Sequence, residues 1–310
     1  MATFSQHLAL ASTFKDNNEN KNRFSALKYA LRMYLFHNNL LDEIESFFAE
    51  NEFRKILMTL PRFKEDIYKQ QLRRCFYKGS TNTERLFFMR SHFTLLERLH
   101  NTDTLIGFYT EQVQPITFIA NAKQFSCRIS YHHDVIREGY LWLTMEMDGE
   151  ILLKIIFWLM EYQGEPSLCV STIQGGKNTL EANRLFTKTF WGLRPQNMGM
   201  QLLRWYAETL GIQQIITFEI DNIWSKKIID RKTIADFLQE QGAQPIKNTP
   251  YLKLAAITPR KDLSEVPSKK RSLYRSRFEF LDQSGIHAKT LFSTYLITKN
   301  SSDNKNDSSH

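Results

Sequence analysis

The sequence of 310 residues predicts a mixed α/β fold, in which an antiparallel meander and a strand-helix-strand unit form one sheet behind a helical N-terminal part. Three observations lead to this prediction. Apolar residues recur at helical spacing between residues 24 and 100, and Asp148-Gly149 separates two β-prone runs as a hairpin turn does. The last third of the chain alternates between helix and strand patterns.

Residues 24–100 form the predicted helical N-terminal region. Ile44, Phe47 and Phe48 fall on one face of a helix, because three- and four-residue spacings bring side chains together there. Residues 1–23 are expected to be flexible, ending in a loop rich in Asn and Asp.

Residues 101–285 form the predicted mixed α/β domain, which opens with short β-prone runs bounded by turn residues. Gly164 and Pro166 mark a second turn after the one at Asp148-Gly149. We expect strands at residues 105–113, 126–131, 139–147, 150–160 and 167–173.

The second half of this domain alternates, with Gly211 and Gly242 as the expected helix stops. We expect helices at residues 196–210 and 232–241, strands at 214–220 and 251–257, and a basic helix at 262–285. The remaining residues, 286–310, are expected to be a C-terminal segment with a disordered tail.

The net charge of +8 favours partners of negative charge. Anionic lipid and phosphorylated cofactors fit this balance, and nucleic acid is not the expected partner. Cys75, Cys127 and Cys169 are too widely separated for a metal-ligand spacing, so we expect no metal and a reduced, cytoplasmic setting. A peripheral position at the inner membrane is the alternative.

The segment around Arg194 carries the most informative motif. It reads Gly-Leu-Arg-Pro-Gln-Asn-Met-Gly and leads into the predicted helix at 196–210. A loop that enters a helix N-terminus presents free backbone N–H groups and can hold a phosphate. The predicted cofactor-binding residues are Arg194, Gln196, Asn197, Met198 and Gly199. The alternative is a tight helix entry with a surface arginine.

This motif resembles the acyl-CoA loop of the GNAT N-acyltransferases, Gln/Arg-x-x-Gly-x-Gly/Ala followed by Leu-Leu. Arg194 matches its first position, Gly199 its last, and Leu202-Leu203 the leucine pair. The resemblance implies a GNAT-like sheet and a site for acyl-CoA or another acyl or aminoacyl carrier. Two features depart from the pattern: Asn197 replaces the middle glycine, and Leu238 stands where many of these enzymes carry a proton-donating tyrosine.

A basic run interleaved with aromatic residues follows in the predicted C-terminal helix. Guanidinium and ammonium groups at this density suit phosphate-bearing surfaces. An amphipathic helix with a solvated basic side is the alternative explanation. The predicted anion-binding residues are Lys269, Lys270, Arg271, Arg275 and Arg277.

A second resemblance, to the VirK/YbjX family of bacterial proteins, covers roughly residues 60–283. It implies a role in virulence and in tolerance of antimicrobial peptides, and supplies no reaction. Ser276 interrupts a basic run that is continuous in other family members. The residues that carry the resemblance are Arg137-Glu138-Gly139, Ile173-Gln174-Gly175, Gly192-Leu193-Arg194-Pro195, Leu210-Gly211, and the basic run from Pro267 to Arg277 with Leu281-Asp282.

Acyl transfer to an amine needs a general base, because the amine must lose a proton. The predicted catalytic residues are Glu138, Glu219 and Asp221, chosen from a wider set that also includes Glu161, His132 and His133. The residue pattern does not select among them.

Three hypotheses follow. The first is an acyltransferase-like enzyme whose acceptor is a small amine, a lipid head group or a protein. The second is a non-catalytic protein that binds an anionic membrane surface or another anionic partner through residues 269–277. The third is an interaction factor for an envelope protein.

Overall fold

The structure, a computed structural model, describes residues 3–13, 19–36, 38–72, 75–133, 137–176, 179–223, 231–258 and 260–297. Its helices are α1 (Phe4–Thr13), α2 (Glu19–Phe36), α3 (Asn38–Ala49), α4 (Glu52–Thr59), α5 (Phe63–Leu72), α6 (Asn82–Leu99), α7 (Thr102–Thr110), α8 (Leu180–Thr189), α9 (Pro195–Thr209), α10 (Arg231–Glu240) and α11 (Ser268–Ser293), with a short 3-10 turn at Ile220–Asn222. Its strands are β1 (Ile116–Ala120), β2 (Lys123–Ser130), β3 (Leu141–Met147), β4 (Glu150–Tyr162), β5 (Glu165–Gly175), β6 (Gln214–Phe218), β7 (Gln244–Pro245) and β8 (Tyr251–Leu254).

The eight strands form one mixed sheet in the order β1-β2-β3-β4-β5-β6-β8-β7. Every neighbouring pair is antiparallel except β5 and β6, which run parallel. The predicted hairpin turn is present between β3 and β4, with Asp148 at φ 52° and Gly149 at φ 82°. The predicted fold class, a mixed sheet with an antiparallel meander and flanking helices, is confirmed.

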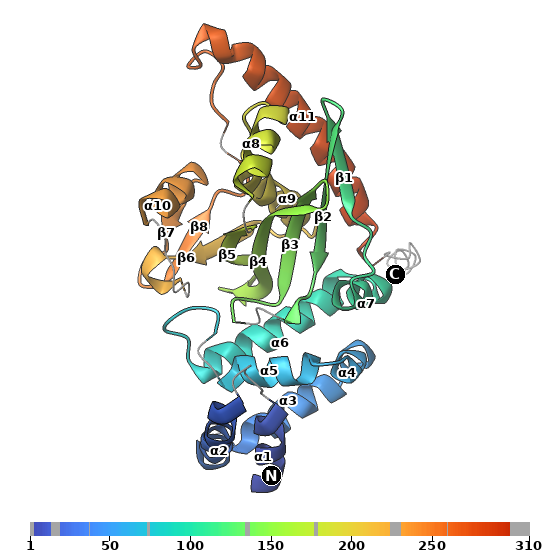
Figure 1. The fold of residues 1–310 in the computed structure, drawn as a ribbon, viewed down its shortest axis with the longest axis vertical. Coiled ribbons are helices and arrows are strands. Elements are labelled where there is room, and N and C mark those ends of the chain that lie inside the picture. The colour runs from blue at the N-terminus through green and yellow to red at the C-terminus, as the bar shows by residue number, and fades with distance from the viewer. Residues whose placement is uncertain are drawn as a thin grey trace, which may run out of the picture.

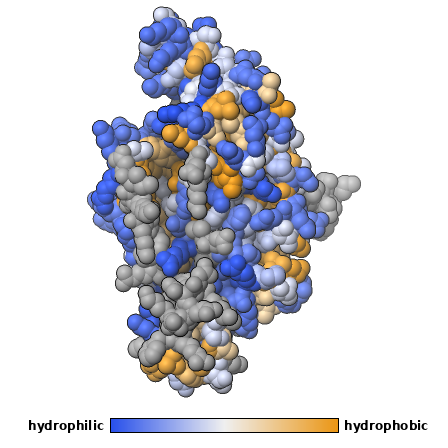
Figure 2. Space-filling view, viewed as in Figure 1, coloured by the Kyte–Doolittle hydropathy of each residue, from blue (hydrophilic) through white to orange (hydrophobic). Residues whose placement is uncertain are grey.

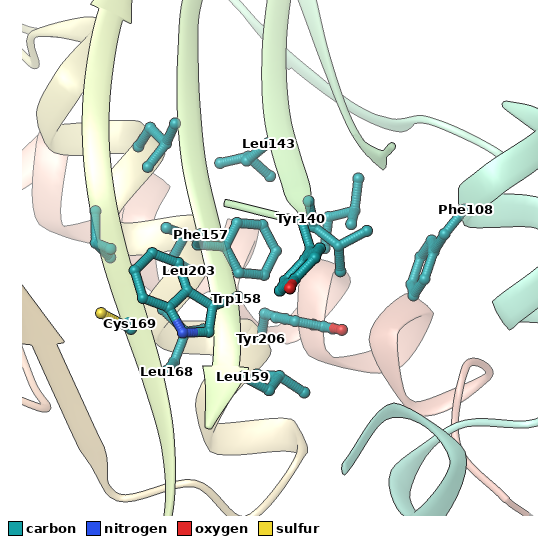
Figure 3. Packing of buried hydrophobic residues seen from close by; sticks show 14 of the residues in the cluster. Phe108, Tyr140, Leu143, Phe157, Trp158, Leu159, Leu168, Cys169, Leu203 and Tyr206 are labelled. Atoms are coloured by element: carbon teal, nitrogen blue, oxygen red, sulfur yellow. The ribbon is translucent and has the colours of Figure 1, made fainter. Parts of the chain in front are cut away.

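Helices cover the sheet from both sides and at one end (Figure 1). Helix α9 lies against one face and α11 packs behind it, where Tyr206 meets Phe292 with ring centroids 5.1 Å apart. On the other side, α6 contacts β4 through Phe88, whose ring centroid lies 5.7 Å from that of Trp158. Both faces of β4 are therefore buried, as Figure 3 shows for Phe157 and Trp158.

The predicted strand at residues 105–113 is wrong, because this segment forms α7. Asn101 caps the helix by accepting a hydrogen bond from the Thr104 N–H, and Glu111 ends it in the left-handed conformation. Leu105, Phe108 and Tyr109 then lie buried on one face. The β1 strand that opens the sheet was not predicted.

The ends of the chain also differ from the prediction. Part of the segment expected to be flexible forms α1, because Phe4 and Ala11 pack against Ala26 and Ala30 of α2. Helix α2 begins at Glu19, inside the predicted polar loop, and α11 runs on to Ser293. The tail predicted to be disordered, residues 301–310, lies outside the described residues.

A buried histidine joins the helical end to the sheet. His100 caps α6, where its Nδ1–H donates to the Leu96 carbonyl at 3.2 Å, while its Nε2 accepts from the Tyr206 hydroxyl at 2.7 Å. Burial lowers the pKa of His100 from 6.5 to about 4, and it lowers the pKa of His92 in the same direction. Both side chains are neutral in the folded protein at neutral pH.

We therefore expect the protein to lose stability in mild acid. The unfolded chain binds a proton at His100 below about pH 6.5, whereas the folded chain does so only near pH 4. Stability present above pH 6.5 is thus lost as the pH falls toward 4, by about 3 kcal/mol from this residue. Denaturant unfolding of wild type and His100→Gln across this pH range measures the difference. If the free energy of unfolding falls with pH equally in wild type and in the variant, the lowered pKa of His100 is contradicted.

Candidate functional site

The sheet opens where its only parallel pair ends. Strands β5 and β6 pair from Ser167 to Val170, with Thr217 as the last partner on β6, but β5 continues to Gly175. On its other edge β5 stays paired with β4, and Ser171 is left over between two pairs in a β-bulge. A bulge bends and twists its strand. The far half of β5 therefore separates from β6.

A cavity of about 620 Å³ fills this opening, and we call it the splay cleft. The described residues that line it are apolar or neutral and polar, without an ionisable side chain. Such a lining suits a long uncharged group better than an ion. The lining comprises Leu152, Leu153, Val170, Ser171, Thr172, Ile173, Gln174, Gly175, Asn183, Pro195, Gln196, Met200, Thr217, Ile223, Thr233, Ile234, Phe237, Leu238 and Leu254.

The predicted loop at Arg194 leads into this cleft. Arg194 is the N-cap of α9 and Pro195 its first residue, and Pro195 and Gln196 line the cavity. The N–H groups of Asn197 and Met198 both donate to the Arg194 carbonyl, at 3.0 and 3.1 Å. Pro195 has no N–H, so among the described residues the amides of Arg194 and Gln196 are the ones in this turn without a backbone acceptor.

The Arg194 guanidinium lies at the surface. It forms an ion pair with Glu240 at the end of α10, and its side chain is 41% exposed. Asn197 accepts a long hydrogen bond, 3.4 Å, from the Gln241 amide. Both side chains thus connect the start of α9 with the end of α10.

Met198 and Gly199, predicted to bind a cofactor, face the core instead. Met198 is fully buried, and a Cβ atom added at Gly199 would lie 2.7 Å from methyl groups of Leu153 and Ile155. The close approach that glycine allows here is that of α9 to β4. This correction follows from helix geometry, because residues three and four positions after Pro195 turn toward the sheet.

Arg204, which was not predicted from the sequence, holds the wall of the cleft together. It is 2% exposed and donates to the Ala255 carbonyl at 2.9 Å and to the Gln241 side-chain oxygen at 2.9 Å. Burial lowers the pKa of this guanidinium to about 10. Arg204 thereby ties α9 to the end of α10 and to the residue after β8.

Glu138 is the predicted base that lies beside the cleft. Its carboxylate accepts a 2.7 Å hydrogen bond from the amide of Gln174, which lines the cavity. Glu138 is 8% exposed, and this burial raises its pKa. The pairing joins two motifs that carry the family resemblance and stand far apart in the sequence.

The other predicted bases lie elsewhere. Asp221 forms an exposed ion pair with Arg231 at 2.5 Å, and Glu219 lines a separate cavity beside residues 245–250. Glu161 lies 3.8 Å from Arg98 at the surface. None of these carboxylates lines the splay cleft.

The two predicted histidines also lie outside the cleft lining. His132 is within 3.8 Å of Glu111, and His133 Nδ1 lies 2.8 Å from the buried carboxylate of Asp66. Tyr131 donates to the same Asp66 oxygen at 3.1 Å. Burial raises the pKa of Asp66.

A second cavity, of about 580 Å³, adjoins the cleft, and we call it the rim pocket. It lies between α8, the turn before α9, and Leu273 of α11. Asn183, Pro195 and Gln196 line both cavities, so the two are neighbours with these residues between them. Arg184, Lys188 and Arg194 line the rim pocket, and Arg184 and Arg194 form ion pairs with Glu181 and Glu240, whereas Lys188 has no ion pair with a described carboxylate.

The basic run divides into two groups. Lys269, Lys270 and Arg275 are exposed, without an ion-pair partner among the described residues. Arg271 donates to the Val266 carbonyl at 2.9 Å, and Arg277 donates twice to the Trp191 carbonyl, at 2.8 and 2.6 Å. Part of the donors of Arg271 and Arg277 therefore bind backbone oxygens, which leaves fewer of them for an external anion than on Lys269, Lys270 or Arg275.

The described chain has neither a candidate membrane span nor a candidate metal site. No described helix combines the length and apolar character that crossing a bilayer requires. Among these residues no three His, Cys, Asp or Glu side chains come together as a metal site would require.

The comparisons with known proteins give a family and two curated relatives. A profile described as "Protein of unknown function (DUF535)" matches residues 18–289. Uncharacterized protein YbjX of Escherichia coli (strain K12) is 28% identical over 181 residues, covering 56% of this chain and 55% of that protein. An uncharacterized protein of Haemophilus influenzae is 32% identical over 131 residues, covering 40% and 44%. The chain thus spans about half the length of the curated relatives it matches, and the VirK/YbjX resemblance is confirmed.

Among solved structures, two mutants of a cAMP-binding acyltransferase from Mycobacterium smegmatis overlap with 72% of this chain. The sequence identities are 12% and 11%, the TM-scores 0.29 and 0.30, and the shares of those chains covered 65% and 64%. Overlaps at these TM-scores do not establish a shared fold.

Proposed function

This chain belongs to the DUF535 family of proteins of unknown function, and we propose that it is an acyltransferase-like enzyme whose donor is an acyl thioester. The acyl-bearing arm of the donor lies in the splay cleft, with its phosphate at the start of α9. The acceptor is an amine, whether a small molecule, a lipid head group or a protein side chain.

One observation carries this proposal. The opening between β5 and β6 is neutral and mostly apolar, and it leads to a helix N-terminus next to a guanidinium. Ligands of open α/β sheets bind where neighbouring strands diverge at their carboxyl ends, and a helix N-terminus favours negative charge. A donor with a neutral chain and an anionic head fits both parts.

Glu138 and Gln174 supply the acid-base chemistry in this proposal. The acceptor nitrogen attacks the thioester carbonyl, an N–C bond forms and the C–S bond breaks. The proton lost by nitrogen passes to the Glu138 carboxylate and then to the departing thiolate, so the enzyme ends unchanged. A carboxylate whose pKa is raised by burial is a stronger base than an exposed one.

Replacing Arg194 with alanine should weaken donor binding with little loss of stability. Removal of one charge-assisted contact to phosphate costs about tenfold in affinity, whereas its exposed pair with Glu240 contributes little to folding. Calorimetric titration with hexanoyl-CoA measures the change. Arg90→Ala, which removes a comparable surface ion pair with Glu43, is the matched control. Equal affinity in the two variants would reject the phosphate site.

A second candidate function rests on the exposed cations of α11. Lys269, Lys270 and Arg275 face solvent on the half of the helix that projects beyond the sheet (Figure 1). Such a surface fits an anionic membrane, which would connect the chain to tolerance of antimicrobial peptides. Binding to phosphatidylglycerol vesicles that weakens steeply with salt and ignores hexanoyl-CoA would favour this function.

A further inference from the structure

We propose that the basic rim around the rim pocket is the docking surface for an acidic carrier protein, which delivers the acyl group on its phosphopantetheine arm. This inference rests on the proposed function and specifies its donor. Docking places the phosphate of the arm in the rim pocket and the neutral pantetheine and acyl chain in the splay cleft.

The first argument is the distribution of charge. Arg184 and Lys188 of α8 line one side of the rim pocket, and Leu273 of α11 lines the other. Lys269 and Lys270 stand one helical turn before Leu273, so their side chains share its face of α11. Cations on two helices thus flank one cavity. Arg184 is paired with Glu181, whereas no ion pair with a described carboxylate neutralises Lys188, Lys269 or Lys270.

Apolar side chains lie inside this basic rim. Leu180 is 62% exposed and Leu273 is 38% exposed, and both line the rim pocket. Figure 2 shows apolar surface set among hydrophilic surface in this upper part of the molecule. An apolar centre with a charged border is the usual composition of a protein interface, and a cationic border selects an acidic partner.

The rim pocket suits one phosphodiester better than the nucleotide of CoA. The turn at the start of α9 offers only the amides of Arg194 and Gln196 among the described residues, since those of Asn197 and Met198 bind the Arg194 carbonyl. No aromatic side chain is among its described lining residues, so an adenine base would have only the guanidinium groups of Arg184 and Arg194 to stack on. A carrier-bound arm brings one phosphate and no base.

A flat membrane fits this geometry less well. The cations lie on either side of a cavity that shares Asn183, Pro195 and Gln196 with the splay cleft. A narrow arm that protrudes from a folded partner can pass through both cavities, whereas a lipid surface meets only their outer edge.

Charge reversal tests the inference. The probes are a bacterial acyl carrier protein loaded with a hexanoyl arm, and hexanoyl-CoA, each titrated at low ionic strength. We expect the double variant Lys269→Glu, Lys270→Glu to weaken binding of the loaded carrier protein by at least about 30-fold. Its affinity for hexanoyl-CoA should fall by a much smaller factor, because this small donor does not extend over the whole basic rim as a folded acidic protein does.

The matched control reverses two exposed lysines far from the rim, Lys28→Glu and Lys247→Glu, with the same change in net charge. Equal losses in the control and the rim variant would overturn the docking surface. Binding of hexanoyl-CoA but not of the loaded carrier protein by wild type would also overturn the docking surface. The same holds if reversal of Lys269 and Lys270 weakens only binding to phosphatidylglycerol vesicles. If wild type binds neither thioester, the proposed function itself fails.

Discussion

Glu138→Gln will lower the rate of acyl transfer by about 10²–10³-fold, because loss of a general base removes a contribution of this size. Glutamine keeps the volume of the side chain and still bonds with Gln174, so the cleft keeps its shape. Release of free thiol from a hexanoyl thioester, with a panel of primary amines as acceptors, measures the rate.

The pH profile and the stability separate a catalytic role from a structural one. Wild-type activity should rise with pH through the elevated pKa of Glu138, and this rise should vanish in the glutamine variant. Burial of the carboxylate opposes folding at neutral pH, since the folded state prefers its protonated form. The variant should therefore be at least as stable as wild type.

Glu219→Gln and Asp221→Asn are the controls, because these carboxylates lie outside the described lining of the cleft. We expect both to retain the wild-type rate. A loss of rate in either variant equal to that in Glu138→Gln, or an unchanged rate in Glu138→Gln, would refute the assignment of the base.

Arg204→Ala will lower the free energy of unfolding by about 4 kcal/mol. The change removes the guanidinium and leaves the Ala255 carbonyl and the Gln241 side-chain oxygen buried without these bonds. Denaturant unfolding measures the loss. Arg90→Ala, at an exposed ion pair, should change stability by at most about 0.5 kcal/mol.

The same substitution should loosen one wall of the splay cleft. Ile234, Phe237 and Leu238 of α10 line that wall, and Arg204 holds the end of α10 against α9. Amide hydrogen exchange should speed up in α10 and β8 before the chain unfolds globally. Exchange that increases equally in β2 and β3 would show that Arg204 stabilises the whole molecule rather than this wall.

Local patterns predicted the regular elements well where they were long or punctuated by glycine. The turn at Asp148-Gly149 and the stops at Gly211 and Gly242, with φ 72° and 69°, follow from the backbone freedom of glycine. The segment at Leu105 misled the prediction, since a short apolar run fits strand and helix equally well. Asn101, which caps α7, was the residue in the sequence that favours a helix over a strand here.

The candidate site was only partly predictable from the sequence, because segments far apart in the chain come together to form it. Arg194 and Gln196 could be placed from one continuous motif. The contact of Glu138 with Gln174 depends on how β5 and the segment before β3 are arranged, and residue spacing does not encode that. The inward turn of Arg277 likewise depends on the Trp191 carbonyl, which a different part of the chain supplies.

Ser171, which has no partner on β4, ties the opening of the donor site to the number of residues in β5. Because β5 has one residue more than β4 over that stretch, a feature of the backbone bends the strand where it separates from β6. Relatives could then exchange the lining leucines and isoleucines for larger or smaller ones, and so accept shorter or longer chains, without closing the gap. Deleting Ser171 should remove the bulge from the β4–β5 pair, and we expect this to narrow the opening between β5 and β6.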